Sequence, residues 1–210
     1  TRESAYRERV IESIEELVRD GHPGGRTLAW ARNLSGFVMS ADLVGYRSEE
    51  FENYLRKMIN EWKCSQLKRS LRGMFDYKPN NWGKFGLQSC AAVYAYLGER
   101  EQLIEIRERF RLQVEGPAPS GTSQADTTWY ADPNNKLIIN PAGSKTNVEG
   151  SEVILDGLQP GEMRRAGECK PEPEFTGYAW EGIQPLVGAG RIFERADLPI
   201  WEFGDRAIYR

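Results

Sequence analysis

The sequence Pro79-Asn80-Asn81-Trp82-Gly83-Lys84 opens an apolar run that ends at Tyr96-Leu97-Gly98-Glu99-Arg100, and this run is the most informative feature of the chain. It predicts a helix that begins at Asn80 or Asn81, because Asn is a preferred N-cap residue. The free N–H groups and the positive dipole end at such an entrance also favour an anion. Two interpretations therefore stay open: the two asparagines cap the helix, or their amides bind a ligand carboxylate.

Helical periodicity continues on both sides of this run. Apolar residues recur at helical spacing from Tyr6 to Val18, and the pattern stops in the Gly- and Pro-rich sequence Asp20–Gly25. Further helices are expected at about residues 27–44, 48–62, 99–114, 177–195 and 200–210. Ser48 is a good N-cap for one of them, and Pro185 predicts a kink or a helix start.

The helical period disappears between Glu115 and Gly177. Pro, Gly, Asn, Ser and Thr dominate there, and the strand-like pieces are Thr127–Tyr130 and Lys136–Ile139. An excursion of this length is too long for a simple connection, and long excursions tend to be functional. Short loops between the other helices favour antiparallel hairpins. The expected fold is therefore mainly α, with an irregular or β excursion at about 115–177.

Composition bounds the class of protein. A chain of 210 residues with 40% apolar and 28% charged residues can bury the core of one domain, taken here as residues 1–210. No apolar run approaches the roughly 20 residues that span a bilayer, so a membrane partner is not expected. Cys64, Cys90 and Cys169 are widely spaced and lack nearby His, which argues against a zinc site and favours buried thiols. No metal or other cofactor is predicted, and the chain shows neither an initiator Met nor a signal-peptide pattern.

Residues 63–84 form a local basic patch in a chain whose net charge is only −3. The patch holds one acid, Asp76, against the cations Lys63, Lys68, Arg69, Arg72, Lys78 and Lys84. Aromatic residues lie among or beside them: Trp62, Phe75, Tyr77, Trp82 and Phe85. Cations beside aromatic rings suit a sugar acid, although a solvated helix face with core aromatics would give the same pattern. Nucleic acid is not the expected partner, because the domain as a whole is acidic.

An ordered set of short motifs runs through the chain. In order they are Trp30-Ala31-Arg32-Asn33-Leu34, Ser40-Ala41-Asp42-Leu43-Val44, Asn80-Asn81-Trp82-Gly83, Asp156-Gly157 with Pro160, Glu162 and Arg164-Arg165, Tyr178, Trp201-Glu202 and Asp205-Arg206-Ala207. This set, spread over roughly Arg26 to Arg210, resembles bacterial proteins of the alginate lyase superfamily. It looks most like the (α/α)-toroid polysaccharide lyases that act on alginate or glucuronan.

The resemblance implies an incomplete (α/α) toroid of antiparallel helical hairpins. Similar proteins carry further helices after the position of Trp201–Arg210, so the chain is expected to be a fragment or a short form. The implied activity is cleavage of a uronic-acid polymer by β-elimination, with an acidic polysaccharide as partner. A secreted or periplasmic location would follow from that activity.

β-Elimination at a uronic acid removes the C5 proton, so the adjacent carboxylate must be neutralised, while a base and an acid move protons. Similar lyases use an Asn, a His, an Arg and a Tyr. By resemblance, Asn81 (or Asn80) matches the Asn, Arg165 (or Arg164) the Arg, and Tyr178 the Tyr. The expected substrate-binding residues are Asn80, Trp82, Lys84, Arg164, Arg32 and His22.

Several of these assignments have simpler alternatives. Arg165 could pair with Glu162 at the surface, and Tyr178 could be a core aromatic at a helix start. His22 is the one histidine of the chain and does not lie where the family's His is expected, so it could be a solvated loop residue. Lys84 or a second Arg could supply the missing positive charge.

Two other functions stay open. An α/α toroid also hosts glycosidases, which need two carboxyl groups beside the sugar bond, and Asp156, Glu162 and Glu181 are available. Asp156-Gly157 is also a typical turn sequence. Without a substitute for the family's His, the chain could instead bind uronate without cleaving it.

Overall fold

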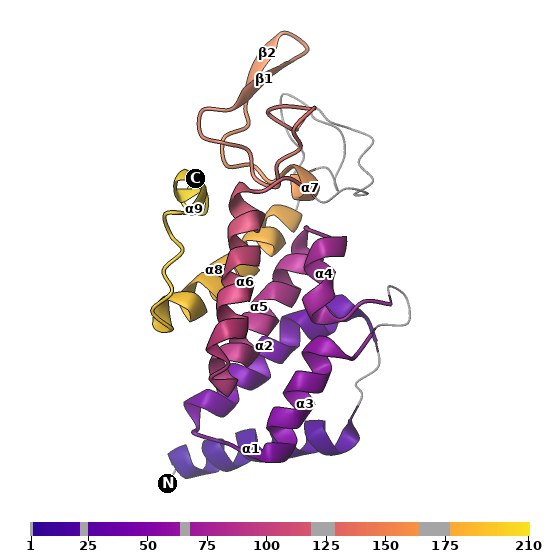
Figure 1. Cartoon of the computed structure of the whole chain (residues 1–210), viewed down its shortest axis with the longest axis vertical. Helices are drawn as coiled ribbons and strands as arrows, with labels where there is room; N and C mark the ends of the chain where they lie inside the picture. The colour runs from indigo at the N-terminus through magenta and orange to yellow at the C-terminus, as the bar shows by residue number, and fades with distance from the viewer. Residues whose placement is uncertain (1, 22–24, 64–67, 119–128, 164–176) are drawn as a thin grey trace.

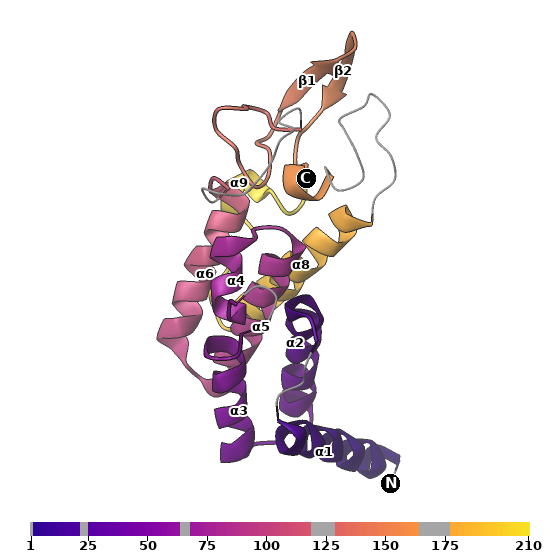
Figure 2. The ribbon, with the colours of Figure 1, turned by 90° about the vertical axis from the view of Figure 1, so that its right-hand side faces the viewer.

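The computed structural model of the chain describes residues 2–21, 25–63, 68–118, 129–163 and 177–210. The described part is mainly helical, as predicted, with one two-stranded sheet. The elements are α1 (Arg2–Asp20), α2 (Thr27–Leu43), α3 (Glu49–Asn60), α4 (Leu71–Tyr77), α5 (Asn81–Leu97), α6 (Arg100–Glu115), β1 (Lys145–Val148), β2 (Ser151–Ile154), α7 (Pro160–Met163), α8 (Tyr178–Arg195) and α9 (Phe203–Arg206). Helices form the main body, α1 crosses one end of it, and β1 and β2 project from the other end (Figures 1 and 2).

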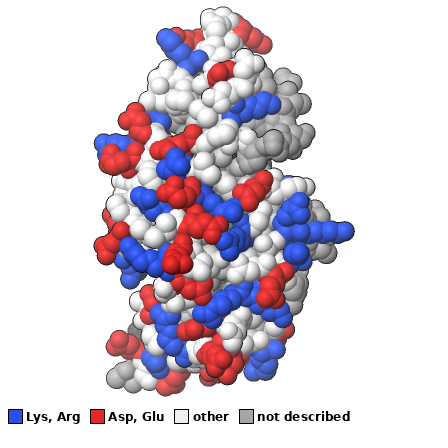
Figure 3. Space-filling model, in the orientation of Figure 1, with Lys and Arg blue, Asp and Glu red and all other residues white. Residues whose placement is uncertain are grey.

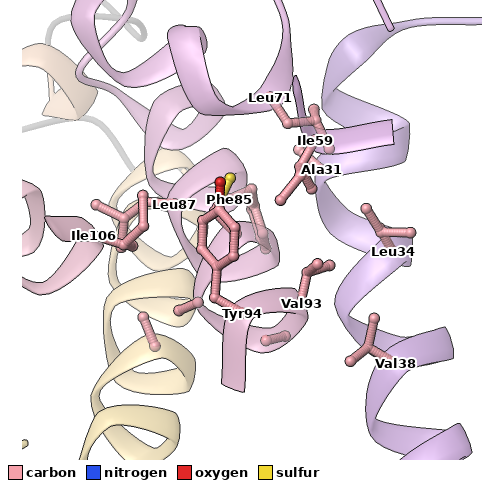
Figure 4. Packing of buried hydrophobic residues seen from close by; sticks show 14 of the residues in the cluster. Ala31, Leu34, Val38, Ile59, Leu71, Phe85, Leu87, Val93, Tyr94 and Ile106 are labelled. Atoms are coloured by element: carbon pink, nitrogen blue, oxygen red, sulfur yellow. The ribbon is translucent and has the colours of Figure 1, made fainter. Parts of the chain in front are cut away.

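Helix α5 is the centre of this body and begins where the sequence predicts. The Asn80 side chain accepts a hydrogen bond from the backbone N–H of Trp82 at 3.1 Å, which confirms Asn80 as the N-cap. Gly98 ends the helix with a left-handed φ of 72°. In Figure 4 the α5 side chains Phe85 and Val93 lie among apolar residues of neighbouring helices, which are Ala31, Leu34, Val38, Ile59, Leu71 and Ile106. Burial on most sides explains why the run is apolar almost throughout.

Helices α2 and α5 run in the same direction. The Ser89 hydroxyl of α5 donates to the backbone carbonyl of Ala31 in α2 at 2.8 Å. About two turns later along α5, the Tyr96 hydroxyl donates to the carbonyl of Tyr46, just after α2 ends, at 2.5 Å. Both helices therefore begin toward the end of the body that carries the excursion.

Helix α8 also runs parallel to α5. Asn81 contacts Glu181 near the two helix starts, and a Cβ on Gly188 would lie 2.3 Å from the Gln88 side chain farther along. Helix α8 begins at Tyr178, as predicted, and continues through Pro185. The expectation of a helix start at Pro185 is therefore wrong; neighbouring α5 and the other packed elements hold the segment helical although the proline lacks an N–H donor.

The short helix α4 was not predicted. The Ser70 hydroxyl caps it by accepting from the N–H of Gly73 at 3.2 Å. It packs tightly on α5, because a Cβ on Gly83 would lie only 2.2 Å from the carbonyl oxygen of Lys78. The glycine of the motif Asn80-Asn81-Trp82-Gly83 is thus required by the close approach of this turn to α5.

The excursion has a small core of its own, in which Trp129 and Leu155 are buried. Its strands β1 and β2 pair antiparallel, and their turn places Glu149 and Gly150 at φ values of 52° and 84°, as a tight two-residue hairpin needs. The expected strand at 136–139 is wrong: among the described residues, Leu137 makes an isolated bridge to Pro117 and the segment is not a strand. The Asn140 side chain instead bonds to the backbone of Trp129 and Ala131 and fixes that segment as a loop.

The C-terminal helix expected from Ile200 onward is also mostly absent. Only Phe203–Arg206 are assigned to α9, and Gly204 and Asp205 have left-handed φ values of 60° and 53°. The chain end is held to the excursion by an ion pair between Arg210 Nε and Asp156 Oδ1 at 2.7 Å. Residues 127–128 of the other expected strand lie outside the described residues.

Burial bears on two further expectations. Cys90 is fully buried in α5, as predicted, and burial raises the pKa of its thiol to about 12. Cys64 and Cys169 lie outside the described residues.

Among the helices that the structure describes, none combines the length and the apolar character that a bilayer span needs.

Candidate functional site

Three side chains from three parallel helices meet near the starts of α2, α5 and α8. Arg32 Nη2 lies 2.5 Å from Glu181 Oε2, and Asn81 Nδ2 donates to the same oxygen at 2.7 Å. The side chains of Arg32 and Glu181 are 39% and 35% exposed, so solvent reaches the pair, whereas Asn81 is buried. The guanidinium also lies over the Phe85 ring, 5.3 Å from its centroid, which helps to fix its orientation.

One cationic donor and one neutral donor thus share a single carboxylate oxygen. A guanidinium supplies charge and several N–H groups, and an amide supplies a further donor without adding charge. Asn81 is held at the first turn of α5, and Glu181 at the first turn of α8. In this arrangement two donors converge on one carboxylate oxygen, which Glu181 supplies from within the chain.

A second charged pair lies beside it, buried between α5 and α7. Lys84 Nζ is 3.6 Å from Glu162 Oε1, with both side chains only 1% exposed, and Lys84 also donates to the Gln159 side-chain oxygen. A Cβ on Gly182 of α8 would lie 2.7 Å from that Gln159 oxygen and 2.9 Å from Glu162 Cγ. The cluster therefore joins α5, α7 and α8 with no room for an added methyl group.

This burial corrects the expectation for Lys84. The sequence placed Lys84 in an exposed basic patch and among the substrate-binding residues, but its ammonium group is enclosed and paired. The long apolar stem and the Glu162 carboxylate make such burial possible, because a charge without a partner would be costly there. Lys84 holds the excursion on the helical body.

The basic patch at 63–84 is smaller than predicted. Arg72 forms an ion pair with Glu105. The hydrogen bond that Arg72 donates is the main reason why the pKa of the Glu105 carboxyl is lowered. Lys63, Lys68 and Arg69 remain exposed. Three of the aromatics are core residues: Trp62, Phe75 and Phe85. On the face in Figure 3, cationic and acidic side chains alternate over the helical body.

The remaining expected residues are distributed as follows. Trp82 is partly exposed, with Lys78 Nζ 4.9 Å from its ring centroid. Tyr178, the first residue of α8, is 40% exposed and is therefore not the core aromatic of the simpler alternative. His22, Arg164 and Arg165 lie outside the described residues.

Sequence reasoning missed the role of Glu181 and overlooked Trp180. Glu181 was considered only as a glycosidase acid, because the partners that define its role are 100 and 149 residues away in the chain. Trp180 precedes it in the first turn of α8 and is 66% exposed. A usable signal was the sequence Tyr178-Ala179-Trp180-Glu181, in which a large aromatic directly precedes a charge at a helix start.

Each of the three carboxyl groups considered for hydrolysis has its own cationic partner, which is Arg210 for Asp156, Lys84 for Glu162 and Arg32 for Glu181. Asp156 lies in the predicted turn, where the N–H of Gly143 donates to it and, together with Arg210, lowers its pKa. Glu162 is buried against Lys84, whereas the side chains of Asp156 and Glu181 are 29% and 35% exposed and each pairs with an arginine. Within the described residues, no cluster of three or more His, Cys, Asp or Glu side chains could hold a metal ion.

Comparisons with family models, with curated proteins and with solved structures give no match to this chain. The feature to be explained is an accessible carboxylate that receives a guanidinium and a buried amide on one oxygen.

Proposed function

We propose that the protein binds a uronic-acid polymer and cleaves it by β-elimination, as a polysaccharide lyase built on an incomplete (α/α) toroid. The observation that carries this proposal is that Arg32 and Asn81 both contact one oxygen of the Glu181 carboxylate. The common direction of α2, α5 and α8 supports the architecture, because in a ring of antiparallel hairpins every second helix runs the same way.

In this proposal the substrate carboxylate takes the place of Glu181. Arg32 and Asn81 would then neutralise the charge that develops when the C5 proton leaves, which is the largest electrostatic demand of the reaction. Glu181 can move away, since its side chain is 35% exposed and lies at the rim of the site. The donors need no rearrangement, because they already hold a carboxylate oxygen.

Two exposed rings supply the sugar contacts. Tyr178 and Trp180 lie in the first turn of α8, within three residues of Glu181. Aromatic faces pack against the apolar faces of sugar rings, and a tyrosine hydroxyl can transfer a proton when cations are near. Tyr178 is the proposed base and acid, and Arg165 its proposed cationic neighbour, both by the resemblance.

The test is an activity assay with two readouts. Purified protein is incubated with alginate, glucuronan, hyaluronan and chitosan, and both ultraviolet absorbance and reducing ends are followed. A lyase produces an unsaturated product that absorbs in the ultraviolet together with new reducing ends. New reducing ends without absorbance would show a hydrolase, and binding without either product would show a uronate-binding module; each result would overturn the lyase.

Two variants sharpen this assay. Tyr178→Phe should abolish turnover and leave oligouronate binding nearly intact, because the hydroxyl acts in the transition state. Arg32→Ala should weaken binding and turnover together, because the guanidinium contacts the carboxylate in both states. A fully active Tyr178→Phe protein would contradict the role proposed for Tyr178.

A further inference from the structure

A pocket of about 400 Å³ opens at the opposite ends of α2, α5 and α8 from the Arg32–Glu181 pair. This volume lies within the range of small-molecule sites, about 300–1,000 Å³. Its apolar lining comes from small residues of α5 and from larger residues of α2 and α8, which are Ala92, Ala95, Gly98, Val38, Met39 and Ile192. Met39 at its edge is 50% exposed, so the apolar lining is open to solvent.

Among the charged residues that line the pocket, cations outnumber acids. Arg100 and Arg195 line it together with one acid, Asp42, which lies 3.6 Å from Arg47. Arg195 is exposed and has no ion-pair partner among the residues that the structure describes. One cation beside the apolar lining is therefore available to a ligand.

The partial charges at the helix ends also contribute to the electrostatic field in this pocket. The C-terminal ends of α5 and α8 place carbonyl groups here, which favour cations, but Arg47 already donates to the carbonyl of Tyr96 and Arg100 to that of Ala196. Helix α6 begins at Arg100, and its N-cap residue Glu99 makes no side-chain capping bond. The positive end of α6 and Arg195, which has no ion-pair partner within the described part of the chain, thus both favour an anion at this place.

We propose that this pocket binds a small molecule with an apolar body and one anionic group, as in a medium-chain aliphatic carboxylate. The carboxylate contacts Arg195 and the start of α6, and the apolar chain lies on Ala95 and Ile192. The site is separate from the Arg32–Glu181 pair and does not depend on the function proposed for that pair.

Three probes of equal chain length test the proposal on the full chain: octanoate, octyltrimethylammonium and 1-octanol. Affinity is measured by calorimetry, and the site is located by amide shifts in ¹H–¹⁵N NMR spectra. Octanoate should bind most tightly and shift the amides of Ala95, Gly98 and Ile192. Equal affinity for all three probes, no octanoate binding, or shifts confined to other regions would overturn the proposal.

Variants separate the charge from the cavity. Arg195→Gln should weaken octanoate binding about tenfold, the loss expected for one charge-assisted hydrogen bond. The matched control is Arg191→Gln, one turn earlier in α8, where the arginine pairs with Glu194 and does not line the pocket; it should bind octanoate normally. Ala95→Leu places a larger side chain in the cavity and should abolish binding while circular dichroism stays unchanged. Unchanged octanoate affinity in Arg195→Gln and Ala95→Leu would show that this pocket is not the site.

Discussion

The Lys84–Glu162 pair joins two parts of the chain through charges that are almost completely enclosed. Removing one partner leaves a buried charge without compensation, which typically costs about 3–5 kcal/mol. We expect Lys84→Met to lower the free energy of unfolding by that amount, measured by urea denaturation. The double variant Lys84→Met with Glu162→Leu should recover much of the loss, because no charge then remains buried. A loss below about 1 kcal/mol for Lys84→Met, the range of surface pairs, would contradict this role.

Cys90 makes the free energy of unfolding depend on pH in the alkaline range. Burial raises its pKa from the ordinary 9.0 to about 12, so the folded state keeps the thiol proton that the unfolded chain loses. Its contribution is fully present below about pH 9 and is lost as pH rises toward 12. Urea denaturation between pH 8 and 11 should show stability falling with pH, and Cys90→Ala should fall less steeply. If the free energy of unfolding fell equally steeply with pH in both proteins, the titration of Cys90 would not explain the pH dependence.

At the scale of elements, the contact between α4 and α5 depends on a missing side chain. An added Cβ on Gly83 would lie 2.2 Å from a backbone oxygen that cannot move easily, so Gly83→Ala should destabilise by about 1–3 kcal/mol. The matched control is Gly36→Ala on the exposed side of α2, where an added Cβ meets nothing within 4 Å. Gly36→Ala should raise the free energy of unfolding by about 0.5–1 kcal/mol, because alanine favours a helix more than glycine does. Thermal unfolding compares both variants, and equal effects would refute the steric explanation.

Helix ends were predictable because their causes are local. Ser48, Asn80 and Gly98 cap or end their helices as their residue types predict. The hairpin β1–β2 was missed because its turn residues Glu149 and Gly150 stand between short, mostly exposed strands with little apolar alternation. Tertiary contacts, rather than local preference, also keep α8 helical through Pro185.

The candidate site was only partly predictable. Arg32 and Asn81 were named from the ordered motifs, but their common partner Glu181 was not, because nothing local marks a contact across 149 residues. Lys84 was misplaced for a related reason. Its neighbours in the sequence are basic and aromatic, whereas its burial is imposed by Gln159 and Glu162 of the excursion.

At the scale of the whole molecule, the fold is a helical body with an excursion fastened to one end of it (Figure 1). The parallel helices α2, α5 and α8 begin toward that end, and their first two turns supply Arg32, Asn81 and Glu181. Two further contacts hold the chain end there, the pair Arg210–Asp156 and the bond from the N–H of Gly204 to Glu115. The proposed receptor for a substrate carboxylate, formed by Arg32 and Asn81, thus lies where the helical body and the excursion meet.

The central claim is that this receptor exchanges Glu181 for the carboxylate of a uronic acid. Glu181→Gln removes the competing charge and leaves Arg32 and Asn81 in place, so affinity for an oligouronate should rise by about tenfold, the factor that corresponds to about 1.4 kcal/mol. Arg32→Ala should lower it by a similar factor, and an oligosaccharide with its carboxyl groups reduced to alcohols should respond to neither change. Calorimetric titration of the three proteins with both ligands measures this directly. Tighter oligouronate binding by Glu181→Gln is the predicted result, and unchanged or weaker binding would contradict the exchange.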